Sequence, residues 1–288
     1  MKHGHQYTHE PARAKLTLSL RVVGLLPDGY HALEALTVAL DDPADEVMVE
    51  VRQEPGVELL VEPAGSAPVD DTNLAVRAAT AVLERAGAAG ARIGLHKAIP
   101  MGAGLGGGSA DAGAVLRVLG RALRVPSDDL HAIAASLGAD VAFCFAGQPA
   151  WMRGRGDDLE PVVLPAALPV VVATPPFGCS TPAVYRSWDE LGGPRDVRLV
   201  AAPAALAPLT VALTNDLEPA AERLEPRLVS FRRRFEAAIE RPALLCGSGS
   251  SYAAVFDDEP SWQRALERAR QALGTRRVWG TWARPRPI

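Results

Sequence analysis

A glycine-rich segment carries the clearest chemical signal in the sequence. Residues 100–109, which we call the glycine loop, read Pro-Met-Gly-Ala-Gly-Leu-Gly-Gly-Gly-Ser. Because glycine has no Cβ, its backbone can approach a ligand closely. A predicted strand over 91–99 precedes the loop and a predicted amphipathic helix over 109–123 follows it. The loop amides and the positive end of the helix dipole would then point to one spot, which predicts a phosphate-binding loop rather than a flexible linker.

The glycine loop does not match the commonest nucleotide-binding motifs. It contains GxGxxG at Gly102, Gly104 and Gly107, but a dinucleotide fold also needs an acidic residue ~20 positions further on, at a strand end. Residues 125–129 lie there and are predicted to form a turn that opens a helix. No Gly-Lys-Ser/Thr follows the glycines, and the protein-kinase motifs His-Arg-Asp and Asp-Phe-Gly are absent. The loop therefore indicates phosphate binding in another class of protein.

Composition narrows the class further. The chain has 288 residues and a formal net charge of −4, with positive and negative residues mixed, so we expect no nucleic-acid partner. The three cysteines, Cys144, Cys179 and Cys246, are far apart, which predicts free, buried thiols in a reducing compartment. The sequence has no apolar run of the length that a membrane span needs, and its polar N-terminus does not read as a signal peptide. We therefore expect a cytoplasmic protein without a membrane partner.

Hydrophobic periodicity predicts a mixed α+β chain. Alternating patterns predict strands over 14–23, 33–40, 46–51, 91–99 and 169–174, and on both sides of a Gly-Ser loop within 244–256. Pro27-Asp28-Gly29 predicts a turn, and Asp71-Thr72-Asn73 predicts the cap of a helix. Further helices are predicted over 109–123 and 126–137.

The second half of the sequence differs from the first in composition and hydrophobic pattern. It opens with a Pro-rich apolar stretch and continues with long helical patterns, so we predict two domains, residues 1–165 and 166–288. One helical stretch carries Arg232-Arg233-Arg234 among several glutamates. We interpret this run as a solvated helix face.

Several other motifs accompany the glycine loop. They are Ala14-Lys15-Leu16-Thr17-Leu18, Asp28-Gly29-Tyr30-His31, Asp71-Thr72-Asn73-Leu74, Leu137-Gly138-Ala139-Asp140-Val141, Ser180-Thr181-Pro182, Asn215-Asp216-Leu217-Glu218-Pro219 and Gly247-Ser248-Gly249. With this order of motifs the chain resembles the GHMP kinase superfamily over nearly its whole length. The Asp-Gly-Tyr-His and Leu-Gly-Ala-Asp motifs resemble its diphosphocytidyl branch more narrowly.

The resemblance implies a fold and a reaction. The expected fold is the two-domain α+β GHMP kinase fold, with an N-terminal domain like domain 2 of ribosomal protein S5 and a ferredoxin-like C-terminal domain. The expected enzyme is an ATP-dependent small-molecule kinase that uses Mg²⁺. It would transfer the γ-phosphate of ATP to a hydroxyl of a cytidine-diphosphate-linked methylerythritol, a step of non-mevalonate isoprenoid (terpenoid) precursor biosynthesis.

The resemblance also implies roles for individual residues. Asp140 matches the general base and Lys15 its partner; a carboxylate can accept the proton of a hydroxyl, and an ammonium offsets charge on a phosphoryl group in transfer. The residues implied to bind the nucleotide are Asn73, Pro100, Met101, Gly102, Ala103, Gly104, Leu105, Gly106, Gly107, Gly108, Ser109 and Ala110. Those implied to bind the acceptor are Thr17, Tyr30, His31, Thr181 and Tyr185, with Tyr30 and His31 at the cytosine.

Alternatives remain for several of these residues. Ser109 is implied to lie near the metal, whereas Asp111 either assists it or is an acidic residue that favours a helix N-terminus. Asn73 either lies near the adenine or only caps its helix. Read without the resemblance, Asp140 would be a turn residue and Lys15 an exposed strand residue.

Two positions depart from the pattern of the superfamily. Thr17 replaces a usual Asn, which keeps a hydroxyl but loses the amide donors, and Ala142 replaces a usual Pro. The Thr17 departure leaves two other functions open. One is a GHMP kinase that acts on homoserine, mevalonate or a sugar. The other is a catalytically weak, nucleotide-binding paralogue.

Overall fold

The computed structural model describes residues 7–164, 166–193 and 213–284, and these residues form two compact units. Unit 1 contains Met1–Ala14, Ala44–Met101 and Gly106–Gly147, and unit 2 contains Lys15–Pro43, Gly102–Leu105 and Gln148–Ile288. Strands β1 (Thr8–Leu25) and β2 (His31–Arg52) contribute to both units. The glycine loop is likewise divided, after Met101 and again after Leu105. The predicted domains, residues 1–165 and 166–288, stay a prediction, because the units are built from interleaved segments.

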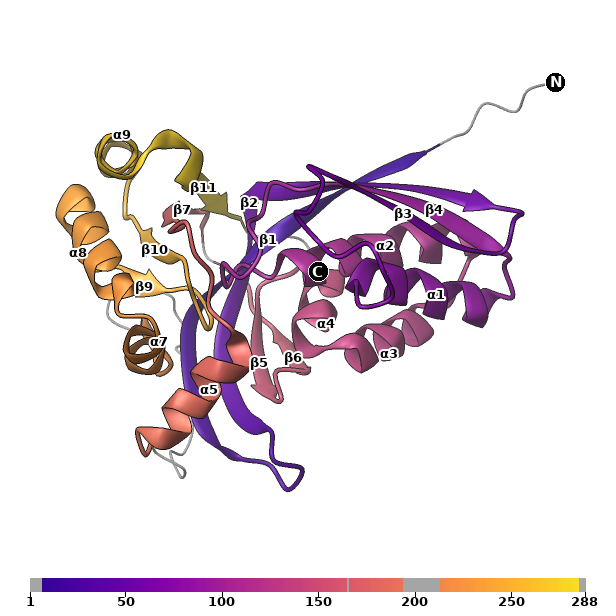
Figure 1. The fold of residues 1–288 in the computed structure, drawn as a ribbon, viewed down its shortest axis with the longest axis horizontal. Helices are drawn as coiled ribbons and strands as arrows, with labels where there is room; N and C mark the ends of the chain where they lie inside the picture. Colours follow the sequence, from indigo (N-terminus) through magenta and orange to yellow (C-terminus); the bar gives the residue numbers. More distant parts are fainter. Residues whose placement is uncertain (1–6, 165, 194–212, 285–288) are drawn as a thin grey trace. The chain divides into compact units, whose positions relative to one another are not determined.

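Unit 1 is a small sheet with helices packed beside it. The second part of β2 pairs antiparallel with β4 (Gly90–His96), which pairs parallel with β3 (Gly56–Glu62). Its helices, which also pack against one another, are α1 (Leu74–Ala86), α2 (Gly107–Leu123), α3 (Ser127–Leu137) and α4 (Ala139–Ala146) (Figure 1). Helix α1 contacts both β3 and β4.

Two local signals in unit 1 act as the sequence predicts. Asn73 is the N-cap of α1, and its side-chain oxygen accepts a hydrogen bond from the backbone N–H of Ala75. Helix α2 buries its apolar stripe, including Val115, Leu116 and Leu119. Residues 139–146 also form a helix, α4, which we did not predict from the sequence. Asp140 therefore lies in a first helical turn.

Unit 2 is built around a mainly antiparallel sheet. Strand β7 (Leu168–Ala173) lies between β11 (Val278–Ala283) and β10 (Tyr252–Val255), and β10 also pairs with β9 (Leu244–Leu245). The other strands of the unit are β5 (Ala150–Gly154), β6 (Asp158–Pro161) and β8 (Thr214–Asn215). Its helices are α5 (Thr181–Glu190), α7 (Glu218–Leu224), α8 (Arg227–Ile239) and α9 (Glu259–Leu273), with the 3₁₀ turn η1 (Thr275–Arg277) before β11. Helix α9 packs on β7, β11 and α8 (Figure 1).

The predicted mixed α+β class is confirmed, but one pair of strands was wrongly divided. Residues 33–40 and 46–51 belong to one strand, β2, although Pro43 lies between them and an internal proline argues against a continuous strand. Burial of Asp45 and a hydrogen bond from the Asp42 N–H to the Thr281 hydroxyl oxygen (2.8 Å) hold the intervening residues in place.

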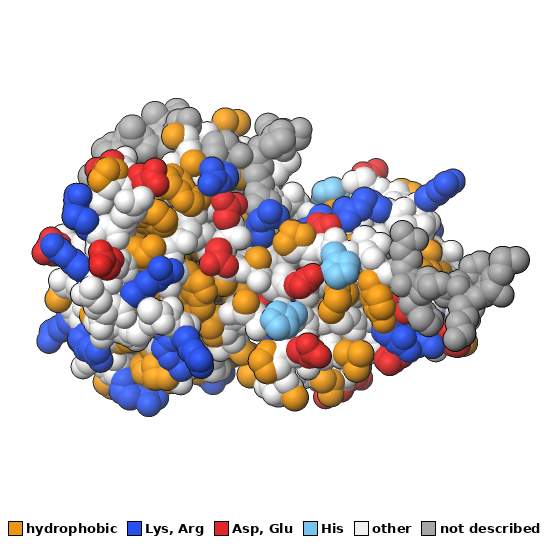
Figure 2. All heavy atoms as spheres, turned by 90° about the horizontal axis from the view of Figure 1, so that it is seen from above, with side chains coloured by type: hydrophobic (Ala, Val, Ile, Leu, Met, Phe, Trp, Pro, Cys, Tyr) orange, Lys and Arg blue, Asp and Glu red, His pale blue; other side chains and the backbone are white. Residues whose placement is uncertain are grey.

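The arginine run and the cysteines each correct one expectation. Arg233 and Arg234 are exposed as predicted, but Arg232 is partly buried among carboxylates. None of the three cysteines forms a disulfide within the described residues; Cys144 and Cys246 are buried, whereas Cys179 is only half-buried. On the face drawn in Figure 2, acidic and basic side chains are mixed over much of the surface, and Lys and Arg side chains gather at the lower left. Within the described residues, no helix combines the length and apolar character needed to cross a membrane.

Candidate active site

Residues 102–105 of the glycine loop, which we call its first half, lie in unit 2 against a second loop. This second loop, residues 246–251, joins β9 to β10, and we call it the Gly-Ser loop. The backbone N–H of Ser250 donates to the Gly102 carbonyl (3.2 Å), and that of Ser251 donates to the Ala103 carbonyl (3.0 Å). The glycine loop is therefore anchored by backbone hydrogen bonds, which leaves it less freedom than a linker would have.

Gly104 shows why this contact needs glycine. A Cβ at this position would lie 2.0 Å from the Cys246 carbonyl oxygen and 2.9 Å from that of Gly249, and the backbone φ angle is +77°. No L side chain fits such a contact, and positive φ disfavours one as well. Gly104 thus permits the two loops to touch.

Lys15 reaches the same place from β1. Its backbone N–H donates to the Leu105 carbonyl (2.9 Å), and its ammonium Nζ lies 3.4 Å from the hydroxyl oxygen of Thr17. A Cβ built on Gly247 would lie 3.3 Å from this Nζ, so the ammonium packs directly on the Gly-Ser loop. Lys15 is only 7% exposed, which excludes the reading of an ordinary exposed strand lysine.

Thr17 takes part in the same polar group. Its hydroxyl oxygen lies 3.4 Å from that of Thr37 and is within reach of the Lys15 ammonium, and Thr17 is 3% exposed. The hydroxyl therefore gives this buried ammonium an acceptor. Nearby, burial raises the pKa of the Cys246 thiol to about 12, so this cysteine is a packing residue and not a nucleophile.

The start of α5 adds a third segment to this part of unit 2. The Thr181 and Ser248 hydroxyl oxygens lie 2.7 Å apart, and the Cys179 N–H donates to the Gly102 carbonyl (3.2 Å). Thr181, implied from the sequence as an acceptor-binding residue, begins α5 and contacts the Gly-Ser loop. We did not predict this pair of hydroxyl groups from the sequence.

The second half of the glycine loop lies in unit 1 and opens α2. Gly106 is the N-cap residue and Ser109 and Ala110 lie in the first turn, so the first helical amides belong to the predicted phosphate loop. A Cβ on Gly108 would lie 3.9 Å from Leu74, the residue after Asn73, so the starts of α1 and α2 are adjacent. The Asn73 amide serves as a helix cap and also donates to the Pro68 carbonyl (2.7 Å).

Asp140 lies in the first turn of α4, where the helix dipole favours a carboxylate. Lys15 belongs to unit 2 and Asp140 to unit 1, so their pairing stays a prediction.

A buried ion cluster beside α2 escaped the sequence analysis. Lys97 Nζ contacts one carboxylate oxygen of Asp45 and one of Asp111, and all three side chains are at most 5% exposed. Asp45 also accepts hydrogen bonds from the backbone N–H groups of Ala98 (2.6 Å) and Ile99 (2.8 Å). We call Asp45, Lys97 and Asp111 the aspartate-lysine cluster. A Cβ on Gly107 would lie 3.6 Å from Asp45, so this cluster borders the first turn of α2.

The cluster gives Asp111 a role that neither sequence alternative foresaw. Burial raises the pKa of its carboxyl group to about 7, despite the ammonium of Lys97 beside it. Burial alone would lower the pKa of Lys97, but Asp111 and Asp45 raise it. Among the described residues, Oδ1 of Asp111 has no hydrogen-bond partner. Asp111 thus pairs with Lys97 inside unit 1, and the described residues contain no group of three or more metal-binding side chains.

The residues implied at cytosine lie at one end of unit 2. The His31 and Tyr185 rings contact each other with centroids 4.7 Å apart, and Trp188 packs edge-on against His31 at 5.5 Å. His31 Nε2 lies 2.9 Å from a carboxylate oxygen of Asp189. Tyr30, in the turn before β2, is 61% exposed, with the guanidinium of Arg155 4.9 Å from its ring centroid. The structure thus brings His31 and Tyr185 together, and it adds Trp188 and Asp189, which the sequence analysis missed.

Comparison with known proteins identifies the class of this fold and site. The family described as GHMP kinases N terminal domain matches residues 73–148, which include the whole glycine loop and Asp140. The fold is also similar to the crystal structure of homoserine kinase from Cytophaga hutchinsonii, with a TM-score of 0.72 at 21% identity, covering 99% of this chain and 96% of that one. At that identity the likeness concerns the fold alone. These two matches identify a GHMP kinase N-terminal domain within a fold like that of homoserine kinase.

More similar proteins define the branch. A protein of Cutibacterium acnes named 4-diphosphocytidyl-2-C-methyl-D-erythritol kinase is 39% identical over 262 residues, 85% of this chain and 84% of its own. A kinase of the same name from Cereibacter sphaeroides is 37% identical, covering 95% of this chain and 96% of its own. A crystal structure of 4-(cytidine 5'-diphospho)-2C-methyl-D-erythritol kinase superposes with a TM-score of 0.78 at 38% identity, covering 96% of this chain and 99% of that one. The chain therefore belongs to the GHMP kinase family, in its 4-diphosphocytidyl-2-C-methyl-D-erythritol kinase branch.

Proposed function

We propose that this enzyme phosphorylates a hydroxyl of 4-diphosphocytidyl-2-C-methyl-D-erythritol with ATP, in non-mevalonate isoprenoid precursor biosynthesis. The observation that carries the proposal is the buried Lys15 ammonium, held between Thr17 and Gly247 beside the glycine loop. An ammonium so placed offsets the negative charge of a transferring phosphoryl group. The names of the relatives supply the acceptor.

We assign the proton transfer to Asp140. Its carboxylate accepts the proton of the acceptor hydroxyl while the hydroxyl oxygen attacks the γ-phosphorus and ADP leaves. Lys15 orients this carboxylate and stabilises the charge on the phosphoryl oxygens. This division of roles needs the two side chains to meet when both substrates are bound.

We assign the nucleotide to the glycine loop, to Ala110 directly after it, and to Asn73. The backbone amides at the start of α2 bind phosphate oxygens, which is the ordinary chemistry of a helix N-terminus. Mg²⁺ prefers few protein ligands together with substrate phosphates, and the hydroxyl of Ser109, in the first turn of α2, fits that chemistry. Asp111 does not fit it, because its carboxylate pairs with Lys97. When bound, the metal supplies positive charge to the phosphates.

We assign the cytosine to Tyr30, His31 and Tyr185. Aromatic rings offer stacking faces to a base. If the Nε2–H of neutral His31 donates to the Asp189 carboxylate, then Nδ1 is the acceptor, which suits the exocyclic amine of cytosine and opposes the carbonyl of uracil. The proposal therefore includes preference for a cytidine-linked acceptor over a uridine-linked one.

The proposal also covers the location of the enzyme, its partners and its domains. We place the enzyme in the cytoplasm, where its three cysteine thiols would stay reduced. Its partners are small molecules, without nucleic acid or membrane. We propose that residues 1–165 act as an N-terminal ATP-binding domain and residues 166–288 as a C-terminal domain.

The first test is turnover by purified protein with a panel of acceptors. ADP should form only with the cytidine-linked acceptor and not with its uridine analogue, homoserine, mevalonate or free sugars. Asp140→Asn should lower kcat by about 10²–10⁴-fold and leave ATP binding nearly unchanged, because it removes the base but not the phosphate loop. The matched control is Asp128→Asn, which alters an exposed first-turn carboxylate of α3 in the same unit and should retain full activity.

The same assay decides between the alternatives. Turnover of another acceptor would replace the proposed substrate. ATP binding without turnover of any acceptor would support the weak paralogue that Thr17 suggested. Full activity of Asp140→Asn would remove Asp140 from the role of base.

A further inference from the structure

A buried side-chain amide, that of Asn215, is hydrogen-bonded to the Gly-Ser loop and to the strand before it. Asn215 Nδ2 donates to the carbonyl of Leu245 (2.7 Å) and to that of Gly247 (2.7 Å), while Oδ1 accepts from the Leu217 N–H (2.9 Å). Asn215 is 8% exposed. Both donors and the acceptor are used, so the orientation of the amide is fixed by its partners.

Asp216, the residue after Asn215, is hydrogen-bonded to the neighbouring strand β1. The backbone N–H of Asp216 donates to the Leu20 carbonyl (3.0 Å), and a carboxylate oxygen of Asp216 accepts from the Val22 N–H (2.9 Å). Both partners lie on β1, the strand that carries Lys15 and Thr17. Residues 215–216 therefore tie the Gly-Ser loop and β1 to the same short segment.

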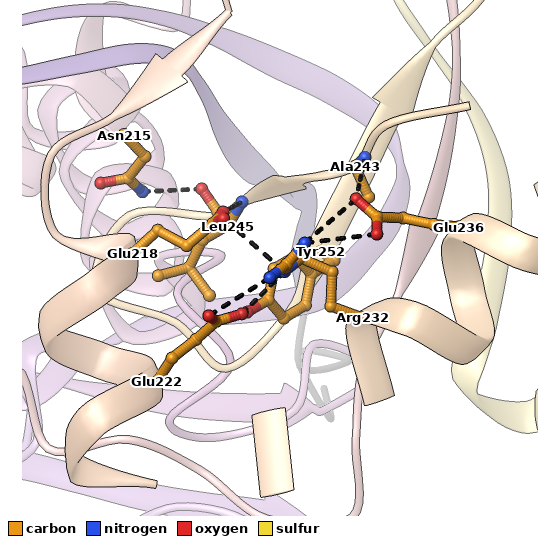
Figure 3. Close-up of polar contacts among 8 residues, drawn as sticks. All are labelled: Asn215, Glu218, Glu222, Arg232, Glu236, Ala243, Leu245 and Tyr252. Atoms are coloured by element: carbon orange, nitrogen blue, oxygen red, sulfur yellow. Dashed lines mark hydrogen bonds and ion pairs between the residues drawn. The ribbon is translucent and has the colours of Figure 1, made fainter. Parts of the chain in front are cut away.

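A cluster of charged side chains contacts the two strands that flank the Gly-Ser loop, β9 and β10. Glu218 accepts a hydrogen bond from the Leu245 N–H (3.1 Å), and Glu222 and Glu236 both contact the guanidinium of Arg232 (Figure 3). Figure 3 shows Arg232 extending from α8 between these carboxylates, beside the ring of Tyr252. The Tyr252 hydroxyl donates to Glu222 (3.0 Å). We call Glu218, Glu222, Arg232 and Glu236 the arginine-glutamate cluster; it anchors both strands that flank the Gly-Ser loop.

We propose that Asn215 is a positioning residue for the phosphate end of the active site. It holds the Gly247 carbonyl, and Gly247 in turn packs against the Lys15 ammonium. The same loop supplies the Ser250 and Ser251 amides that anchor the first half of the glycine loop. Asn215 touches neither ATP nor acceptor in this proposal and acts only through the Gly-Ser loop. The proposal rests on the proposed kinase function where activity is the measurement.

The chemistry of the site requires an amide here. In Asn215→Asp the side chain keeps its size, but a carboxylate oxygen then faces the carbonyl oxygens of Leu245 and Gly247, and acceptor faces acceptor. The loop must move or the carboxyl group must keep a proton. Displacement of Lys15 and of the glycine loop follows, and misplacement of reacting groups by about 1 Å can cost 10²-fold in rate.

The experiment compares Asn215→Asp with Thr281→Val in the full chain. The control is also isosteric and also removes a buried hydrogen bond in unit 2, that between the Thr281 hydroxyl and the Asp42 N–H, but it lies away from the Gly-Ser loop. At a temperature where both variants are folded, Asn215→Asp should lower kcat at least tenfold, with the acceptor KM within about twofold of wild type. Thr281→Val should keep wild-type kcat. Equal kcat losses in both variants, or none in Asn215→Asp, would overturn the proposal.

Hydrogen exchange supplies a measurement that does not need activity. In Asn215→Asp the amides of Ser250 and Ser251 should exchange at least tenfold faster than in wild type, since their acceptors lie on the glycine loop. Thr281→Val should leave these amides protected. If Asn215→Asp does not fold, Asn215→Ala serves for both measurements. Unchanged protection overturns the positioning role, whereas changed protection in a protein without any kinase turnover supports it and counts against the proposed function alone.

Discussion

Each unit contains an ion cluster near its part of the site, and the two clusters differ in how deeply their side chains are buried. In unit 1 the aspartate-lysine cluster borders the start of α2, and its side chains are 5% exposed or less. In unit 2 the arginine-glutamate cluster lies behind the Gly-Ser loop, with side chains 16–25% exposed. The first has one cation for two carboxylates, and the second has one cation for three.

The comparison teaches how burial changes the energetic value of an ion pair. A charge inside a protein loses its hydration, so removing one member of a buried group leaves an uncompensated charge at a cost of about 3–5 kcal/mol. Where water still reaches the charges, it replaces a lost partner, and salt screens what remains. We therefore expect unit 1 to depend on its cluster for folding and unit 2 to depend on its cluster mainly for geometry.

The largest expected effect comes from Lys97→Met. The variant leaves Asp45 and Asp111 buried beside each other without a cation, so the free energy of unfolding should fall by about 3–5 kcal/mol. Urea unfolding followed by circular dichroism measures the loss. The control is Arg85→Met, which removes an exposed pair with Asp129 in the same unit and should cost less than about 1 kcal/mol. Equal losses would show that burial does not distinguish the two.

The next effect is a pH dependence that Asp111→Asn should abolish. The pKa of Asp111 is raised to about 7 in the folded chain, from 3.8 in its ordinary state, so the native protein binds a proton that the unfolded chain releases between these values. Wild-type stability should therefore fall as the pH rises from about 4 to 7, by at most ~1.4 kcal/mol per pH unit from this group. The variant lacks this contribution and should gain relative to wild type as the pH rises. Parallel stability curves would mean that Asp111 is ionised throughout.

The smallest effect is expected from Arg232→Met. Because its partners are partly exposed, the free energy of unfolding should fall by only about 1–2 kcal/mol, and less at 1 M salt than at 0.05 M. Arg233→Met, at the exposed neighbour in the same run, should change it by less than about 0.5 kcal/mol. A loss for Arg232→Met as large as that for Lys97→Met, and insensitive to salt, would erase the difference between the clusters.

Local features of the site could be predicted from the sequence. The glycine loop, the N-cap Asn73 and the helix over 109–123 depend on backbone freedom, a side chain that reaches its own helix, and a periodic apolar stripe. Each signal comes from residues close together in the chain, so these features could be predicted without knowing the tertiary structure. The mixed α+β class follows from the same patterns.

Which charged residues face inward depends on the packing of segments that are distant in the sequence. Lys97 meets Asp45 across 52 positions, and Arg232 lies inside while Arg233 lies outside, although the residues share one type. The single strand β2 runs through Pro43 because distant residues hold its middle, and the two loops meet at Gly104 across more than a hundred positions. Burial and charge pairing depend on what packs against a residue, and residues distant in the sequence supply those neighbours.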